Sequence, residues 1–118
     1  MQIFAARCHL SILSLCAAFV LAGCGGLRPS TVPLAATLEK SRCTAQADTL
    51  MVLLPGAYSS PDEFMREGFV EALNENRLAV DATRVDAHLG YYNDRSILER
   101  LEKDVIAPAR ASGYKAIW

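Results

Sequence analysis

The sequence has little net charge and no basic face, and this excludes one large function class. Its 118 residues contain 12 Lys and Arg against 13 Asp and Glu, a formal net charge of −1. Nucleic-acid binding depends on clustered positive charge, so we expect no nucleic-acid partner. The chain also lacks the glycine-rich nucleotide patterns Gly-x-Gly-x-x-Gly and Gly-x-x-x-x-Gly-Lys-Ser/Thr. No residue pattern indicates a cofactor or a metal, and we expect neither.

Cysteine is scarce in the part of the chain that can fold. Cys8 and Cys16 lie within the first 23 residues and Cys24 directly follows them, which leaves Cys43 alone in the remainder. One thiol cannot form an intramolecular disulfide, so we expect none in the folded part. A lone thiol is notable in an oxidising compartment. Cys43 is either a bystander in a linker or the partner of a thiol on another chain, and we favour the bystander.

Long apolar runs are also absent, except near the N-terminus. Residues 10–22 are almost continuously apolar, but about 20 such residues are needed to span a bilayer. The run has the length of the apolar region of a secretory signal peptide. It ends in Leu21-Ala22-Gly23-Cys24, which resembles the lipobox of bacterial lipoproteins at all four positions.

The lipobox resemblance implies cleavage after Gly23 and a mature chain that starts at a lipidated Cys24. Several acyl chains, at ~0.8 kcal/mol per buried CH₂, would hold such a chain on a membrane. The membrane of the bacterial cell envelope is therefore the expected partner. Gly25 after the cysteine resembles outer-membrane sorting, facing the periplasm. The alternatives are an uncleaved anchor and an ordinary secretory leader.

The chain divides into three regions. Residues 1–23 are expected to be the signal peptide. Residues 24–48 are expected to be the lipidated N-terminus and a flexible linker, since glycine and proline interrupt any apolar period. Within them, residues 34–43 leave open a short helix or an early edge strand. Residues 49–118 are expected to be the folded part.

The folded part is organised around residues 49–63. Residues 50–54 form an apolar run, which is typical of a strand buried on both faces of a parallel sheet. Pro55 and Gly56 end it, because proline lacks a ladder N–H and glycine permits a sharp turn. Ser60 begins a capping-box pattern, which predicts a helix start. The N–H groups after Gly56 then lie at the carboxyl end of a strand, where open α/β sheets bind ligands.

The remaining pattern alternates between strand and helix, which predicts an α/β fold: a partial three-layer structure with a parallel sheet and crossover helices. The second strand has the weaker apolar pattern, so we place it nearer the sheet edge. Pro108 should kink the second helix, and Gly113 is placed for its left-handed cap. The expected elements are a helix over residues 60–77, a strand over 78–85, a helix from Asp94 or Ser96, and the start of a strand over 114–118.

This order resembles the front of an α/β-hydrolase, the fold of many serine esterases and lipases. Over residues 49–118, the strand, Pro-Gly turn and helix resemble the oxyanion loop, and Gly-Tyr-Lys-Ala-Ile-Trp resembles the approach to the nucleophile strand. The resemblance implies a β-α-β-α-β start of that fold and activity on esters or similar acyl compounds. The Gly-x-Ser-x-Gly elbow is absent, so we expect an N-terminal fragment without catalytic residues, inactive alone. The alternative is a small non-catalytic lipoprotein that acts as an envelope interaction module.

Ala57 is the first candidate for an oxyanion-hole donor, through its backbone N–H, and Tyr58 is the second. One N–H donor already in place stabilises a developing oxyanion by ~3 kcal/mol. The alternative for both residues is an ordinary turn between a strand and a helix. The resemblance to the oxyanion loop makes the functional role the one to test.

Other candidates favour structural roles. Ser59 and Ser60 have no base at a suitable spacing, and capping explains Ser60 better than nucleophilic attack does. Asp86 and His88 follow a strand end, where they line a pocket, touch a metal or, as we favour, lie in a solvated loop. Tyr91-Tyr92 either pack over the end of the sheet or meet a substrate, and packing is the default.

Overall fold

The computed structural model describes residues 28–56 and 58–118. The predicted signal peptide, the lipidation residue Cys24 and the oxyanion candidate Ala57 lie outside the described residues. The elements in chain order are β1 (Ala36–Glu39), β2 (Thr49–Leu53), α2 (Glu63–Arg66), α3 (Phe69–Glu75), β3 (Val80–Val85), α4 (Leu89–Asn93), α5 (Ile97–Leu101), the π-helical turn η1 (Glu102–Ile106), α6 (Ala107–Ala111) and β4 (Ala116–Ile117).

The strands form one open sheet in the order β1-β3-β2-β4. β2 pairs in parallel with β3 on one side and with β4 on the other, so that Thr49 lies opposite Val80 and Ala116. β1 pairs antiparallel with β3, with Ala36 opposite Val85. The predicted α/β fold is confirmed and the sheet is mostly parallel. The three strands predicted within residues 49–118 pair in parallel, and β1, which lies before them in the chain, adds an antiparallel strand.

The antiparallel strand comes from the region expected to be a flexible linker. β1 lies within residues 34–43, where an edge strand is one of the two predicted alternatives. Its side chains are mostly exposed, whereas Leu34 just before it is 3% exposed. A short, exposed edge strand has no apolar alternation, so the sequence pattern does not separate it from a linker.

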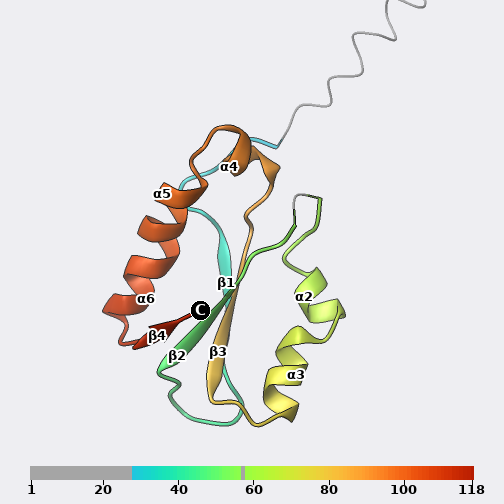
Figure 1. Ribbon diagram of the computed structural model, residues 1–118, viewed down its shortest axis with the longest axis vertical. Helices are drawn as coiled ribbons and strands as arrows, with labels where there is room; N and C mark the ends of the chain where they lie inside the picture. The colour runs from blue at the N-terminus through green and yellow to red at the C-terminus, as the bar shows by residue number, and fades with distance from the viewer. Residues whose placement is uncertain (1–27, 57) are drawn as a thin grey trace, which may run out of the picture.

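Helices cover both faces of the sheet. In Figure 1, α2 and α3 lie on one side of the strands, and α5 and α6 lie on the other. The main apolar core lies on the second side, under the helix that contains η1. Its buried members are Leu34, Val85, Ala87, Tyr91 and Val105, with Val52, Ile97 and Leu101 packed against them.

The second predicted strand is not near the edge of the sheet. β3 lies between β1 and β2, and its middle residues Asp81, Ala82 and Thr83 are all buried. The edge prediction is wrong because it takes the polar side chains of this strand as solvated. Asp81 and Thr83 are buried with hydrogen-bond partners instead.

The helix expected over residues 60–77 is two short helices. Gly68 has a φ of 76°, in the left-handed region, and this residue separates α2 from α3. The helix that contains Pro108 is longer and has the π-helical turn η1 just before the proline. Proline cannot donate to the carbonyl four residues earlier, and the helix changes type in the turn before it. Gly113 has a φ of 101°, as its predicted capping role requires.

Candidate functional site

The parallel strands β2 and β3 end side by side. We call this end of the sheet, formed by the carboxyl ends of the strands and distinct from its outermost strands, the carboxyl edge. The turn at residues 54–62 follows β2, and the loop that leads into α4 follows β3. A third segment, residues 28–34, reaches the same edge beside α4 (Figure 1). We call this third segment the strap. Open α/β sheets bind ligands at this kind of edge.

The turn after β2 is closed by its own backbone. The Ser59 N–H donates to the Gly56 carbonyl at 3.0 Å, and the Glu63 N–H donates to the Ser60 carbonyl at 3.1 Å. Tyr58 is 94% exposed, so the turn lies on the surface. The geometry at Ala57 is outside the described residues, and neither oxyanion candidate is tested by the contacts of the turn.

The predicted capping box is absent. The residue before α2 is Asp62, and no side chain caps the helix. α2 is a single turn, and aligned peptide dipoles add up only over longer helices. Any stabilisation of negative charge at this turn must therefore come from individual N–H groups rather than from a helix end.

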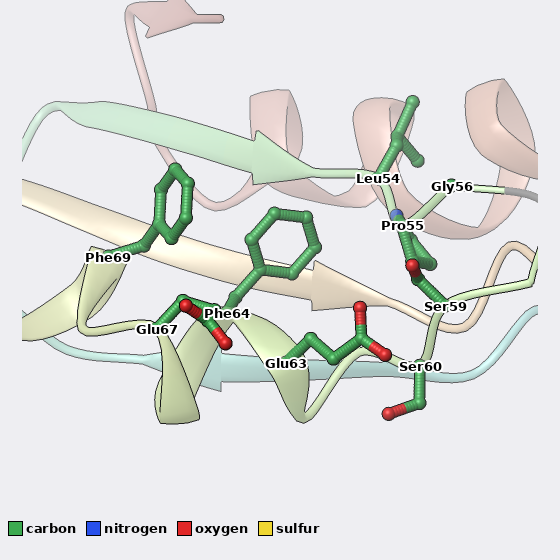
Figure 2. Close-up of a pocket in the computed structure, with 9 residues that line it drawn as sticks. All are labelled: Leu54, Pro55, Gly56, Ser59, Ser60, Glu63, Phe64, Glu67 and Phe69. Carbon is green, nitrogen blue, oxygen red and sulfur yellow. The ribbon is translucent and has the colours of Figure 1, made fainter.

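A cavity of about 220 Å³ lies beside the turn, between the end of β2 and α2. Phe64 and Phe69 stand edge to face with ring centroids 5.4 Å apart. In Figure 2, the Glu63 carboxylate points toward the side of the Pro-Gly turn, and the Phe64 ring is drawn between the β2 strand and the α2 helix, in front of β3. The cavity combines an apolar wall with carboxylates. Its lining is Leu54, Pro55, Gly56, Ser59, Ser60, Glu63, Phe64, Glu67 and Phe69.

The serines of the turn are not activated nucleophiles in the described residues. No hydrogen bond there joins Ser59 or Ser60 to a histidine or a carboxylate. A catalytic serine needs a base within hydrogen-bond reach. Neither serine is hydrogen-bonded to His88, which agrees with the sequence, where no base lies at a suitable spacing from either serine.

His88 is a helix-capping residue. Its Nδ1 accepts a hydrogen bond from the Gly90 N–H at 3.2 Å, at the start of α4, and its ring lies 4.6 Å from that of Tyr91. Burial and the nearby positive charge of Arg28 lower the pKa of His88 below its usual value. The ring is therefore neutral near pH 7. This corrects the prediction of a solvated loop histidine.

The strap is fixed to the carboxyl edge by polar contacts along its length. Arg28 pairs with Asp86. The buried Tyr91 hydroxyl accepts from the Thr31 N–H at 3.1 Å and donates to the Thr31 carbonyl at 3.0 Å. The Leu34 N–H donates to the Asp104 carboxylate at 2.8 Å. Tyr91 thus packs over the end of the sheet, as predicted, and holds the strap there.

Arg84 links the edge strand to the turn after β2, and the sequence alone does not single it out. Its side chain is 10% exposed and lies 2.7 Å from carboxylate oxygens of both Glu39 and Asp62. Hydrogen bonding to Glu39 raises the pKa of Arg84 further above its already high usual value. The guanidinium therefore stays charged and ties β1, β3 and the segment before α2 together.

A second polar cluster lies at the opposite edge of the sheet, where the parallel strands begin. Asp81 is 1% exposed, and its carboxylate accepts from Lys40 Nζ at 2.8 Å, from the Ser41 N–H at 2.8 Å and from the Tyr114 hydroxyl. Burial alone would raise the pKa of Asp81, but these hydrogen bonds outweigh it and the pKa is lowered. The cluster is a fully partnered structural tie, far from the carboxyl edge.

The last two candidates from the sequence are the lone thiol and a metal site. Cys43 is exposed and free, with its sulfur 3.5 Å from the Asn74 carbonyl oxygen. Within residues 28–56 and 58–118, no cluster of His, Cys, Asp or Glu is arranged to hold a metal ion. In the same part of the chain, no helix is both long and apolar enough to cross a membrane.

Comparisons with known proteins add no relative. No protein-family model, no curated protein and no solved structure matches this chain. The residues and the geometry of the carboxyl edge therefore carry the functional argument.

Proposed function

We propose that residues 49–118 form the front of an α/β-hydrolase domain, in which the turn after β2 supplies oxyanion-hole donors at Ala57 and Tyr58. The complete catalytic unit would act on esters or similar acyl compounds. The observation that carries the proposal is the parallel pairing of β2 with both β3 and β4, with the Pro-Gly turn at the carboxyl end of β2.

The pairing of the strands supports the expectation that the resemblance implies, a β-α-β-α-β start. β2 pairs in parallel with β3 on one side and with β4 on the other. Helices connect these strands in the chain and cover both faces of the sheet. Parallel neighbours joined by crossover helices are what such a start requires, and the Pro-Gly turn lies at the carboxyl end of the central strand β2.

The chemistry assigned to this segment is limited to charge stabilisation. N–H groups already in place stabilise an oxyanion without reorganisation, and one such donor contributes ~3 kcal/mol. They do not form the oxyanion, which needs a nucleophile and a base. The 118 residues contain no Gly-x-Ser-x-Gly, so the proposal assigns the nucleophile to none of them.

We also propose that the chain is held in the cell envelope by a lipidated Cys24, on the outer membrane facing the periplasm. The support is the Leu-Ala-Gly-Cys sequence at 21–24 behind an apolar run. Mass spectrometry of the N-terminal peptide tests it directly. A peptide that starts at an acylated Cys24 is the expected result.

The hydrolase proposal is tested on the reading frame and then on the protein. We expect the nucleotides after the Trp118 codon, read in all three frames, to encode a Gly-x-Ser-x-Gly elbow close by. The product extended to include it should hydrolyse p-nitrophenyl esters and react with a fluorophosphonate at the elbow serine, whereas the 118-residue chain should do neither. Ala57→Pro, which removes one N–H, should lower kcat of the extended product by about 10²–10³-fold. Ala57→Ser keeps the N–H and serves as the control.

Two results would overturn the proposal. One is the absence of an elbow in every frame. The other is turnover by the 118-residue chain that disappears when Ser59 or Ser60 is replaced, because the nucleophile would then lie inside the turn.

A further inference from the structure

The strap places the beginning of the folded part at the carboxyl edge. Thr31 and Leu34 are hydrogen-bonded to Tyr91 and Asp104, and Arg28 pairs with Asp86. Tyr91 is 1% exposed, so the tyrosine that holds the strap is itself part of the core. Residues 28–34 are therefore attached to the same end of the sheet as the turn after β2 (Figure 1).

The distance to the predicted anchor is short. Four residue steps separate Cys24 from Arg28, and a fully extended chain covers about 3.3–3.6 Å per residue. The Cα of Arg28 therefore cannot lie more than about 14 Å from that of Cys24. If Cys24 carries acyl chains in a bilayer, Arg28 and the strap that begins with it are held close to the membrane surface.

The exposed side chains at the carboxyl edge suit that position. The most exposed large apolar side chains among the described residues are Tyr58 at 94%, Leu98 at 80%, Trp118 at 77% and Val32 at 75%. All except Trp118 lie at the carboxyl edge: in the turn after β2, in the first turn of α5 and in the strap. Tyr92 of α4 adds a second exposed tyrosine, at 43%. Tyrosine is favoured at membrane interfaces because its ring is apolar and its hydroxyl stays in water.

We propose that the carboxyl edge docks on the bilayer that holds Cys24, with Tyr58, Leu98 and Val32 in the headgroup region. This inference rests on the lipidation part of the proposed function. It makes the turn after β2 face lipid, so the acyl compounds that reach the turn are those the bilayer presents. The short connection and the exposed apolar side chains at one edge are independent observations with the same consequence.

The test uses the full chain, expressed with its leader in a bacterial host. The purified lipoprotein is reconstituted in vesicles of phosphatidylethanolamine and phosphatidylglycerol that contain a headgroup-region quencher lipid. One fluorophore is attached at position 58, in the Tyr58→Cys, Cys43→Ser chain. The matched control carries the same fluorophore on the native Cys43, which is exposed beside the carboxyl end of α3, at the opposite edge of the sheet. Leu98→Cys with Cys43→Ser gives a second carboxyl-edge position.

We expect quenching at positions 58 and 98 to be several-fold stronger than at Cys43, with a blue-shifted emission at the first two. Equal quenching at all positions, or stronger quenching at Cys43, would overturn the proposed orientation. An N-terminal peptide without acylation at Cys24 would overturn it as well. The readout does not involve hydrolysis. A docked chain whose extended product fails on esters therefore keeps this inference while the hydrolase assignment fails.

Discussion

The carbonyl oxygen of Arg28 occupies the space that a β carbon on Gly90 would need. The His88 ring lies on the same side, 2.9 Å from that β-carbon position. The strap therefore crosses α4 at Gly90, where the absence of a side chain leaves room for the Arg28 backbone. Gly90 is required here by close approach, because no positive φ is involved.

Gly90→Ala should loosen the strap. The added methyl group must displace either the Arg28 backbone or the His88 ring, and overpacking of this kind costs about 1–3 kcal/mol. Chemical denaturation measures the loss, and amide hydrogen exchange should rise at Thr31 and Leu34. Gly56→Ala is the control, because its β carbon would lie 3.6 Å from the nearest atom, an ordinary contact. Equal exchange at Thr31 in both variants would show that Gly90 does not hold the strap.

Tyr91→Phe should release the strap without changing the core. The phenyl ring keeps its packing, but the Thr31 N–H and carbonyl lose their hydroxyl partner. Thr31 is exposed, so its freed groups can bond to water. A net intramolecular hydrogen bond contributes about 0.5–1.5 kcal/mol, and we expect a loss in that range in urea unfolding. Tyr92→Phe, at the neighbouring and partly exposed position, should change stability by less than about 0.5 kcal/mol. A similar loss in both variants would contradict the assignment of the tie to Tyr91.

The parts of the fold that were predictable depend on neighbours in the chain. The apolar run at 50–54 becomes β2, and Gly113 takes its left-handed φ, because burial period and backbone freedom are local properties. The antiparallel pairing of Ala36 with Val85 was not predictable, since it joins segments far apart in the sequence and β1 has no apolar pattern. The parallel pairing on which the functional proposal depends was predicted from the alternation of strands and helices.

The candidate site was predictable to the same extent. The turn at Pro55-Gly56 lies at the expected end of β2, but the strap above the next loop was not expected. Its partners, Tyr91 and Asp86, carry no pattern that points to residues 28–34. Asp81 gave a misleading signal, because a carboxylate in a strand is usually solvated. Here three donors from other segments hold it.

His88 should make the protein less stable in weak acid. Its pKa is lowered from the usual value of about 6.5, so below that pH the unfolded chain binds a proton that the folded chain does not. Unfolding free energy should therefore fall as pH decreases from about 6.5 toward the folded-state pKa. His88→Asn keeps a side-chain acceptor for the cap but cannot titrate. In a chain that starts at Cys24, His88 is the only histidine.

The expected result is a smaller loss of stability between pH 7 and pH 5 in His88→Asn than in the wild type, measured by urea unfolding at each pH. An NMR titration of the His88 ring gives the folded-state pKa independently. Parallel stability curves for the two proteins across this range would show that the histidine is not the group that titrates.

Asp81→Asn should be the most destabilising substitution at the opposite edge. Hydrogen bonds to a charged group contribute about 1.5–3 kcal/mol, and the buried carboxylate accepts from Lys40, Ser41 and Tyr114. We expect a loss of about 2–3 kcal/mol at pH 7. Asp48→Asn is the control, because Asp48 pairs with Lys115 at 3.3 Å in an exposed position. Exposed pairs contribute about 0–1 kcal/mol.

The pH dependence separates the charge of Asp81 from its shape. The pKa of Asp81 is lowered, so its contribution is complete above the unfolded value of about 3.9 and is lost as pH falls through the folded value. The pKa values of Lys40 and Tyr114 are raised, so their contributions are lost as pH rises above about 10. The difference in unfolding free energy between wild type and Asp81→Asn should therefore shrink below pH 4 and above pH 10. Asp94 and Glu99 also have lowered pKa values, but both are present in each protein and cancel in this difference. A difference that stays constant down to pH 2 would mean that folding does not lower the pKa of the Asp81 carboxyl.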